Sequence, residues 1–316
     1  MKYKRRRFVS GECMHIYQRS VEGFNIFYGI EDYLVFFMIF SVVARLYKVT
    51  ILELCIMINH IHVLLASEKL KEVSDFIMHY TSLFAREFNR DSGRRGPLFH
   101  KSFGSAPKTG SKSIRSTIVY IGNNPVEKGI CASADGYRWN FLSYIRRMKS
   151  GVRIPERELS RRLLKYMKVV DGMNSRDQYI SYMGLQKMMA DLNASEVDML
   201  ADHIIMTYWP FDSDYLLEFY GSYENMIMAM RSTSGNEYDI KELYYPESDT
   251  VYKKMITLMR NELKVESDHQ VKVVLTMTPE EKFRLAQILQ RHTCATLNQI
   301  SRFLHLPIKS STSRDT

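Results

Sequence analysis

The first 125 residues alternate between short apolar runs and longer stretches in which apolar residues recur every three or four positions. Short runs bounded by turn residues are typical of strands, and the longer period is typical of amphipathic helices. Strands are predicted at 14–19, 50–58, 61–66 and 98–103, and helices at 31–47, 70–90 and 113–123. For the last helix we expect Ser111 or Ser113 as the N-cap and Pro125 as the stop. The order β-α-β-β-α-β, followed by a helix, predicts an α+β fold with the antiparallel sheet of the ferredoxin-like split βαβ arrangement.

The pattern changes at residues 151–155, a turn-prone segment with the sequence Gly-Val-Arg-Ile-Pro. Beyond it, amphipathic stretches predict a mostly α-helical domain over residues 151–308, distinct from a first domain over 1–150. Thr278 and Pro279 form a helix start, with the threonine as N-cap and the proline at the first helical position. Helices predicted at 282–291 and 297–304 could form a helix-turn-helix near 280–306. The polar residues 309–316 are expected to be a disordered tail.

The net charge of +9 is divided unevenly along the chain. Residues 1–150 hold 23 Lys and Arg against 12 Asp and Glu, a net of +11, whereas residues 151–316 hold 21 against 23, a net of −2. A local excess of Lys and Arg is expected of a surface that neutralises phosphates. The first half is therefore expected to contact nucleic acid, with simple solubility as the alternative explanation.

Composition excludes several classes of protein. The four cysteines, at positions 13, 55, 131 and 294, form neither a CxxC pair nor a zinc framework and are expected to be reduced. The most apolar run, 34–44, spans about eleven residues, whereas a membrane-spanning helix needs roughly twenty. The basic N-terminus is followed by polar residues rather than by the apolar stretch of a secretory signal. These features predict a cytoplasmic protein that does not span a membrane.

Candidate metal ligands occur as a histidine pair in a strand-like segment. His60 and His62 are two positions apart, so in a strand both side chains point to the same face, near enough to share one metal ion. Neutral imidazole is a common ligand of divalent cations. The pair alone is weak evidence, because two histidines at this spacing also arise by chance.

A tyrosine and an asparagine share one face of the helix predicted at 113–123. Tyr120 and Asn124 are four positions apart, which places them one helical turn from each other. The Asn124 carbonyl oxygen could complete a metal site while Tyr120 presents its phenol to a phosphate held there. An oxygen ligand suits Mg²⁺ or Mn²⁺ better than a closed zinc site. The alternative role for any of the 20 tyrosines is packing, which we expect for Tyr80 in its apolar helical stripe.

Several ordered motifs carry a resemblance to a known family. They are HIYQR at 15–19, NHIHVLL at 59–65, FAREFN at 84–89, GPLFHKSF at 96–103, YI at 120–121 followed by NPVEKG at 124–129, and YRW at 137–139. Over about residues 8–148 the chain resembles the single-tyrosine HUH transposases of insertion sequences, and within them the REP-associated tyrosine transposases. Ile58 stands where the family often has proline, and Gly122 loosens the helix that carries Tyr120, by up to about 1 kcal/mol relative to alanine.

The resemblance implies a catalytic domain in which His60 and His62 bind the metal, Tyr120 is the nucleophile and Asn124 is the third ligand. It also implies metal-dependent cleavage and rejoining of single-stranded, hairpin-flanked DNA through a 5′-phosphotyrosine intermediate, with Mg²⁺ or Mn²⁺ as cofactor. Family members can form dimers that exchange the tyrosine helix, so a homodimer is also considered. Such a transposase is expected in the bacterial cytosol, with the nucleoid.

The basic half supplies candidate DNA contacts. Trp139 could stack on an unpaired base, although a tryptophan there more often closes a core. The candidate contact residues are Lys4, Arg5, Arg6, Arg7, Arg19, Arg94, Arg95, Lys101, Arg138 and Trp139. Two alternatives to an enzyme remain: a non-catalytic module that grips single-stranded nucleic acid, and a DNA-binding regulator that acts through residues 282–304.

Overall fold

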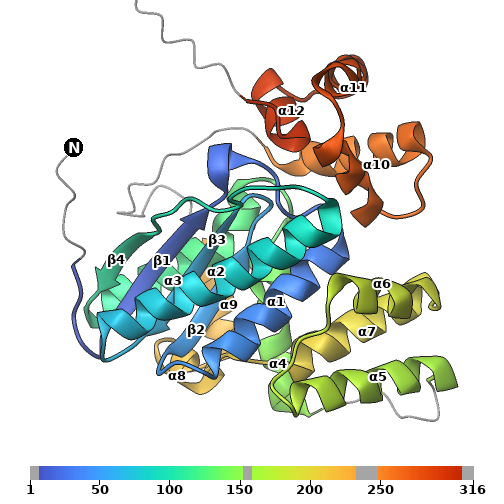
Figure 1. The fold of residues 1–316 in the computed structure, drawn as a ribbon. Coiled ribbons are helices and arrows are strands. Elements are labelled where there is room, and N and C mark those ends of the chain that lie inside the picture. Colours follow the sequence, from blue (N-terminus) through green and yellow to red (C-terminus); the bar gives the residue numbers. More distant parts are fainter. Residues whose placement is uncertain (1–6, 152–158, 233–247, 308–316) are drawn as a thin grey trace, which may run out of the picture.

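The computed structural model describes residues 7–151, 159–232 and 248–307 (Figure 1). Its first part follows the predicted order of elements. These are β1 (Cys13–Arg19), α1 (Ile30–Ala44), β2 (Thr50–Ile56), β3 (His60–Ala66), α2 (Leu70–Ser92), β4 (Gly104–Lys108) and α3 (Gly110–Glu127). The strands form one antiparallel sheet in the order β2-β3-β1-β4. The predicted α+β class with a ferredoxin-like sheet is thereby confirmed.

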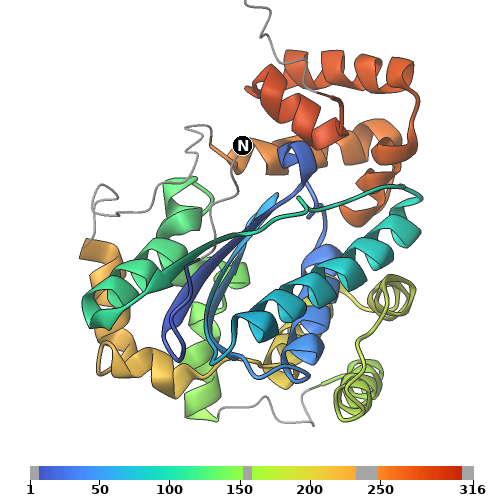
Figure 2. The same cartoon turned by 60° about the vertical axis from the view of Figure 1, so that its left-hand side comes forward.

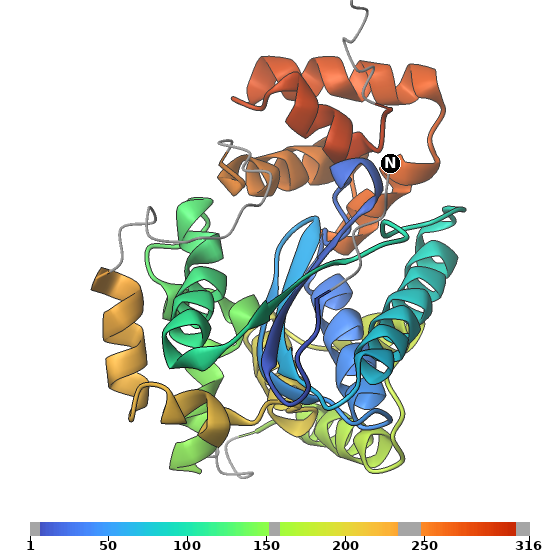
Figure 3. The same cartoon turned by 90° about the vertical axis from the view of Figure 1, so that its left-hand side faces the viewer.

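Helices cover both faces of this sheet. Figure 3 shows the sheet nearly edge-on, with α1 and α2 on one side and α3, α4 (Leu142–Ser150) and α9 (Tyr223–Ser232) on the other. Every residue of β3 is buried, as expected of a strand with both faces covered. Helix α1 is apolar almost all round because α2, α6 (Tyr182–Ala190) and α7 (Ala194–Thr207) pack against it in addition to the sheet.

The predicted fourth strand was wrong in position. Residues 98–103 contribute only an isolated bridge between Phe99 and Ser20, and the regular edge strand is Gly104–Lys108. Its sequence, Gly-Ser-Ala-Pro-Lys, has no apolar alternation because an edge strand buries less of its surface. Pro107 pairs with Met14 there, and an edge strand tolerates proline because one row of its backbone N–H groups has no ladder partner.

Both predicted ends of the tyrosine helix were also wrong. Helix α3 begins at Gly110 after an N-cap at Thr109, which makes no side-chain cap, so neither Ser111 nor Ser113 caps it. Pro125 lies inside the last turn instead of ending the helix. The helix continues because the N–H of Lys128 donates to the Asn124 and Val126 carbonyls, although Pro125 itself has no N–H to give.

Most of the described residues beyond 151 are helical, as predicted. The helices of this part not yet named are α5 (Arg161–Asn174), α8 (Ser213–Glu218), α10 (Thr250–Leu263), α11 (Pro279–His292) and α12 (Leu297–Leu304). Short 3₁₀ segments occur along the whole chain and include η1 (Val21–Gly23), η2 (Ala134–Gly136), η3 (Arg138–Asn140) and η5 (His269–Thr276). Thr278 caps α11 and Pro279 takes its first position, which confirms that helix start. In all three views α10–α12 sit over one end of the sheet (Figures 1, 2 and 3).

The division into domains stays a prediction. Most of the predicted boundary, at residues 152–155, and the whole predicted tail, 309–316, lie outside the described residues. Across the described part, helices from the second half pack directly on the first. The Tyr28 hydroxyl donates to the carbonyl of Phe303 in α12 (2.6 Å), and the Asn123 amide donates to the carbonyl of Met230 in α9 (2.8 Å). Among the described helices, none combines the length and apolar character needed to cross a bilayer.

Candidate active site

Three histidines lie on one face of the sheet, on the side covered by α3. In the antiparallel register Tyr17 of β1 faces His62 of β3, and His15 faces Leu64. Because side chains alternate along a strand, His15 and Tyr17 share the face of His60 and His62. The ring centroids of His60 and His62 are 5.0 Å apart, and those of Tyr17 and His62 are 5.1 Å apart. The two strands therefore gather three imidazoles and one phenol into a single cluster.

Hydrogen bonds set which nitrogen of His60 is available. Asn59 Nδ2 donates to the Gly23 carbonyl (3.0 Å), which fixes the orientation of the Asn59 amide. Asn59 Oδ1 then lies 2.7 Å from His60 Nδ1, and because a carbonyl oxygen can only accept, His60 Nδ1 must carry the proton. The Nε2 atom of neutral His60 therefore keeps a lone pair that can bind a cation.

His62 is held in a similar way by another histidine. His62 Nδ1 lies 3.0 Å from His15 Nε2, and the two rings stack with centroids 5.3 Å apart. If His62 donates through Nδ1, its Nε2 keeps the lone pair, as in His60. An imidazole that binds a metal usually has its other nitrogen fixed by such a partner. His15 belongs to the HIYQR motif, but its role was not predicted; the signal was its same-face spacing from Tyr17 on a strand next to the His60–His62 pair.

Helix α3 places Tyr120 and Asn124 over these histidines. The Tyr120 ring meets His62 edge-on at 5.6 Å and His15 edge-on at 5.8 Å. Both Tyr120 and Asn124 are buried, with 8% and 7% of their surface exposed. Gly122 lies between them, and a Cβ there would come within 2.6 Å of Met230 Cε and 3.2 Å of Leu142 Cδ1. The glycine thus lets α3 approach α4 and α9 closely. One chain brings together all four residues of the predicted site.

Burial keeps the imidazoles neutral. It lowers the pKa of His60 to about 3, with a further contribution from the charges of Arg19 and Lys128 and a partial offset from Asn124. It likewise lowers the pKa of His15 to about 3, aided by Lys108, and holds the pKa of His62 well below its usual range. Neutral imidazole is the form that binds metal ions.

The cluster contains donor atoms of the types that bind divalent cations. Asn124 lies close enough to His60 to raise its pKa, yet among the described residues none donates a hydrogen bond to the buried Asn124 Oδ1. Such an oxygen is costly to bury unless something binds it. In the described ranges no three His, Cys, Asp or Glu side chains form a metal-binding group. Two imidazoles and an amide oxygen are therefore the donor set in question.

Comparison with known proteins finds a similarity over the segment that contains this cluster. Residues 15–124 match the profile of the family described as "Transposase IS200 like". Over this segment the chain is similar to the IS200-like transposases. The matched segment begins at His15 and ends at Asn124, so it includes every residue of the cluster. No curated protein matches the chain in sequence.

A solved structure of a REP-associated tyrosine transposase bound to a REP hairpin is also similar to the chain. The two share 16% sequence identity with a TM-score of 0.38, over 45% of this chain and 82% of that one.

The residues predicted to contact DNA lie in different settings around the matched segment. Arg19 ends β1 beside His60, and its Nε donates to the Tyr17 hydroxyl (2.6 Å). Arg95 is exposed and Arg94 half-buried, both in the turn after α2. Arg7 and Lys101 are exposed as well. Lys4, Arg5 and Arg6 lie outside the described residues.

Two of the residues predicted to contact DNA bind other parts of the protein in this structure. Trp139 is 9% exposed and stacks on Tyr33 with ring centroids 4.4 Å apart. Arg138 forms ion pairs with Asp198 (2.8 Å) and Asp202 (3.5 Å) of α7. The stacking favours the alternative already considered for Trp139, closure of the core, whereas a DNA contact by Arg138 stays a prediction.

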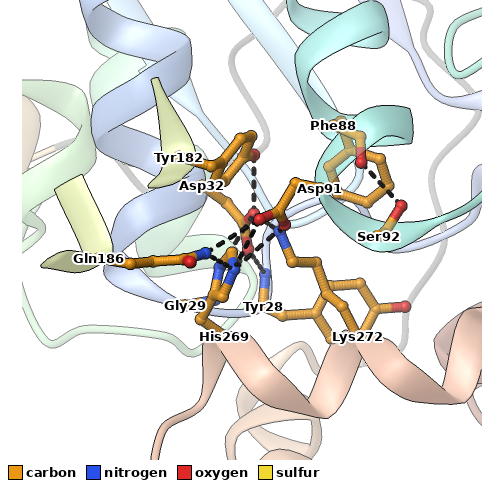
Figure 4. Close-up of polar contacts among 10 residues, drawn as sticks. All are labelled: Tyr28, Gly29, Asp32, Phe88, Asp91, Ser92, Tyr182, Gln186, His269 and Lys272. Atoms are coloured by element: carbon orange, nitrogen blue, oxygen red, sulfur yellow. Dashed lines mark hydrogen bonds and ion pairs between the residues drawn. The ribbon is translucent and has the colours of Figure 1, made fainter. Parts of the chain in front are cut away.

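A second buried polar cluster was not predicted. It joins the start of α1, the end of α2, α6 and η5 (Figure 4). Lys272 Nζ lies 2.6 Å from both Asp32 Oδ1 and Asp91 Oδ2, and His269 Nε2 lies 3.1 Å from Asp91. The Tyr182 hydroxyl donates to Asp32 Oδ1 (2.8 Å), and Gln186 Nε2 donates to Asp91 Oδ1 (2.9 Å). We call these six residues the ionic cluster and His15, His60, His62, Tyr120 and Asn124 the histidine cluster.

Proposed function

We propose that the protein is a metal-dependent transposase-type endonuclease and strand transferase that acts on single-stranded, hairpin-flanked DNA. In this proposal Tyr120 is the nucleophile, and His60, His62 and Asn124 hold Mg²⁺ or Mn²⁺. The observation that carries it is the position of the Tyr120 ring, edge-on to His62 at 5.6 Å, on the same helix as the buried acceptor oxygen of Asn124. The net charge of +11 over residues 1–150 supports DNA as the partner.

The chemistry follows from these groups. The Tyr120 oxygen attacks the phosphorus, a bond forms from the phenol oxygen to phosphorus, and the bond to the 3′-oxygen breaks. The DNA 5′-phosphate stays on Tyr120 and the leaving strand ends in a 3′-hydroxyl. Attack by another 3′-hydroxyl on the phosphotyrosine releases Tyr120 and rejoins a strand, so no external energy source is needed. A divalent cation, when bound, supplies stabilisation of the charge that develops on the non-bridging phosphate oxygens.

The chain's own residues orient this reaction. Asn59 fixes the ring of His60 through Nδ1, and His15 holds the ring of His62 in the same manner. Tyr120 and Asn124 are fixed relative to each other by one turn of α3. The proposal needs one chain only, because Tyr120 lies against the histidines of its own chain. A homodimer stays a prediction.

One observation favours the alternative of a non-catalytic nucleic-acid-binding module. His62 is fully buried and Tyr120 is 8% exposed, so a DNA strand reaches the cluster only if the covering residues move. A module that only binds DNA would need no such opening. The two functions differ in whether a covalent adduct forms.

The test is an adduct assay. The protein is incubated with labelled single-stranded hairpin DNA from the ends of its own genomic locus, with Mg²⁺ or Mn²⁺, and run on a denaturing gel. We expect a covalent adduct for the wild type and for the control variant Tyr80→Phe, whose hydroxyl is buried in α2 away from the cluster. For Tyr120→Phe we expect a loss of at least about 1,000-fold. DNA binding without an adduct in the wild type would support the module instead.

A further inference from the structure

A cleft of about 460 Å³ lies between the turn that follows α2 and the C-terminal helices. Its lining contains three cationic side chains and a histidine, and no carboxylate among the described residues. The lining residues are Phe24, Gly93, Arg94, Arg95, Leu275, Thr276, Lys282 and His305. This cleft is separate from the histidine cluster, none of whose members lines it.

Among the described residues, Arg94 and Lys282 donate hydrogen bonds to neutral groups. Arg94 donates to Asn89 Oδ1 (3.1 Å) and to the carbonyls of Gly96 (3.2 Å) and Pro97 (2.9 Å). Lys282, only 8% exposed, donates to the Leu275 carbonyl (3.2 Å). Within the described ranges no ion pair forms at Arg94, Arg95 or Lys282. A buried lysine without a counter-charge is uncommon in folded proteins.

The cations are close enough to act on one another. Burial lowers the pKa of Lys282, and the charge of Arg94 lowers it further. The carboxylate of Asp91, three residues before Arg94, does not offset this charge because it is already bound by Lys272, His269 and Gln186 (Figure 4). An anion in the cleft would remove the repulsion between the cations and accept hydrogen bonds from them.

The cleft adjoins the end of the sheet where the candidate site lies. Phe24, in its lining, directly follows Gly23, whose carbonyl accepts from Asn59. The same Asn59 side chain holds His60. Helix α12 reaches this segment as well, since Asn25 donates from its backbone to the carbonyl of Arg302 (3.1 Å). A DNA strand that leaves the histidine cluster at this end of the sheet would pass next to the cleft.

We propose that this cleft binds a backbone phosphate of the DNA strand that the histidine cluster cleaves, with Arg95 and Lys282 as the principal contacts. The proposal rests on the proposed function for the identity of the strand. Arginine and lysine N–H groups are the usual partners of backbone phosphates, and such contacts position a nucleic acid without reading its sequence. The C-terminal helices thereby contribute to DNA binding through the edge they share with the transposase domain.

The experiment measures binding of the hairpin DNA by fluorescence anisotropy over a range of salt concentrations. The variants are Arg95→Gln, Lys282→Gln and the double variant, and the control is Lys165→Gln, an exposed lysine of α5. We expect the double variant to weaken binding about tenfold and to lower the salt slope by about 1, because neutralised contacts release fewer counterions. The control should keep the wild-type slope. Melting curves show that each variant is folded, and Arg95→Gln, at an exposed position, provides the test if Lys282→Gln unfolds.

A second arm locates the phosphate. A series of oligonucleotides carries a neutral methylphosphonate in place of one phosphate at a time. At one position this replacement should weaken binding by the wild type but not by the double variant. An unchanged salt slope, or no position with this coupling, overturns the proposal, as does the absence of any DNA binding. If the replacement of one phosphate has this effect but the wild type forms no covalent adduct, the cleft binds a phosphate and the proposed catalysis is refuted. The failure of one proposal can therefore be told from the failure of the other.

Discussion

The histidine cluster and the ionic cluster are both buried and both polar, yet their groups are satisfied in opposite ways. In the ionic cluster every charge meets an opposite one: Lys272 lies 2.6 Å from two carboxylates, and Asp32 also accepts from Tyr182 and from the backbone of Tyr28. In the histidine cluster the imidazoles are neutral, and the Asn124 oxygen has no donor among the described residues.

This difference distinguishes a cluster that holds helices together from one that can bind a ligand. Charge pairs and hydrogen bonds between α1, α2, α6 and η5 link those elements, and the charges of the cluster are bound by one another. Lone pairs that are buried without donors have a cost that a bound cation offsets. Burial of a polar group therefore does not by itself mark a functional site; what matters is whether its hydrogen-bonding capacity is already used.

The largest effect on stability is expected from the ionic cluster. Lys272→Met leaves Asp32 and Asp91 buried without their shared cation, and we expect the free energy of unfolding to fall by about 3–5 kcal/mol. Chemical denaturation measures it, with the exposed Lys165→Met as control, which should change it by less than about 0.5 kcal/mol. A decrease in the free energy of unfolding for Lys272→Met as small as that of the control would show that the ionic cluster does not hold these helices together.

A smaller effect, on metal affinity and not on folding, is expected at His15. His15→Gln removes the partner of His62 Nδ1, and the Kd for Mn²⁺, measured by electron paramagnetic resonance, should rise about 10- to 100-fold. His79→Gln is the matched control, because His79 bonds to Tyr47 away from the cluster. If both variants bind Mn²⁺ like the wild type, His15 only packs.

The smallest effect is a pH dependence at Asp91. Burial would raise the pKa of this carboxyl, but the hydrogen bond from His269 and the charge of Lys272 lower it to about 2. A lowered pKa stabilises the fold above the unfolded value of about 3.8, and that stability is lost as the pH falls through the folded value. The free energy of unfolding of the wild type should therefore exceed that of Asp91→Asn by about 1–2 kcal/mol at pH 5. This difference should close towards pH 2 when stability is followed by thermal melts. A gap that stays constant with pH would contradict this.

Local patterns in the sequence predicted most of the sheet and the pairing of the candidate residues. The alternation around His60 and His62 set their shared face, and the four-residue spacing of Tyr120 and Asn124 set theirs. The edge strand was misplaced because residues 104–108 bury too little surface to show an apolar alternation. Pro125 was wrongly predicted to end the helix, because a proline near the end of a helix removes only one backbone hydrogen bond.

The ionic cluster and the basic cleft depend on contacts that no local pattern records. Asp32 and Lys272 are 240 positions apart, and each alone reads as a surface charge. Arg94 and Lys282 come together only because α11 packs over the turn after α2. Such long-range pairs follow from the packing of the second half on the first, which the change in charge and periodicity near residue 151 did not predict.

The most direct test of the account is the identity of the residue that becomes linked to DNA. Wild-type protein is incubated with the labelled hairpin and Mn²⁺, digested with trypsin and nuclease, and the nucleotide-bearing peptide is identified by mass spectrometry. The account predicts a phosphodiester-linked nucleotide on Tyr120, the residue that lies against His62 and His15. A nucleotide on any of the other tyrosines would contradict it.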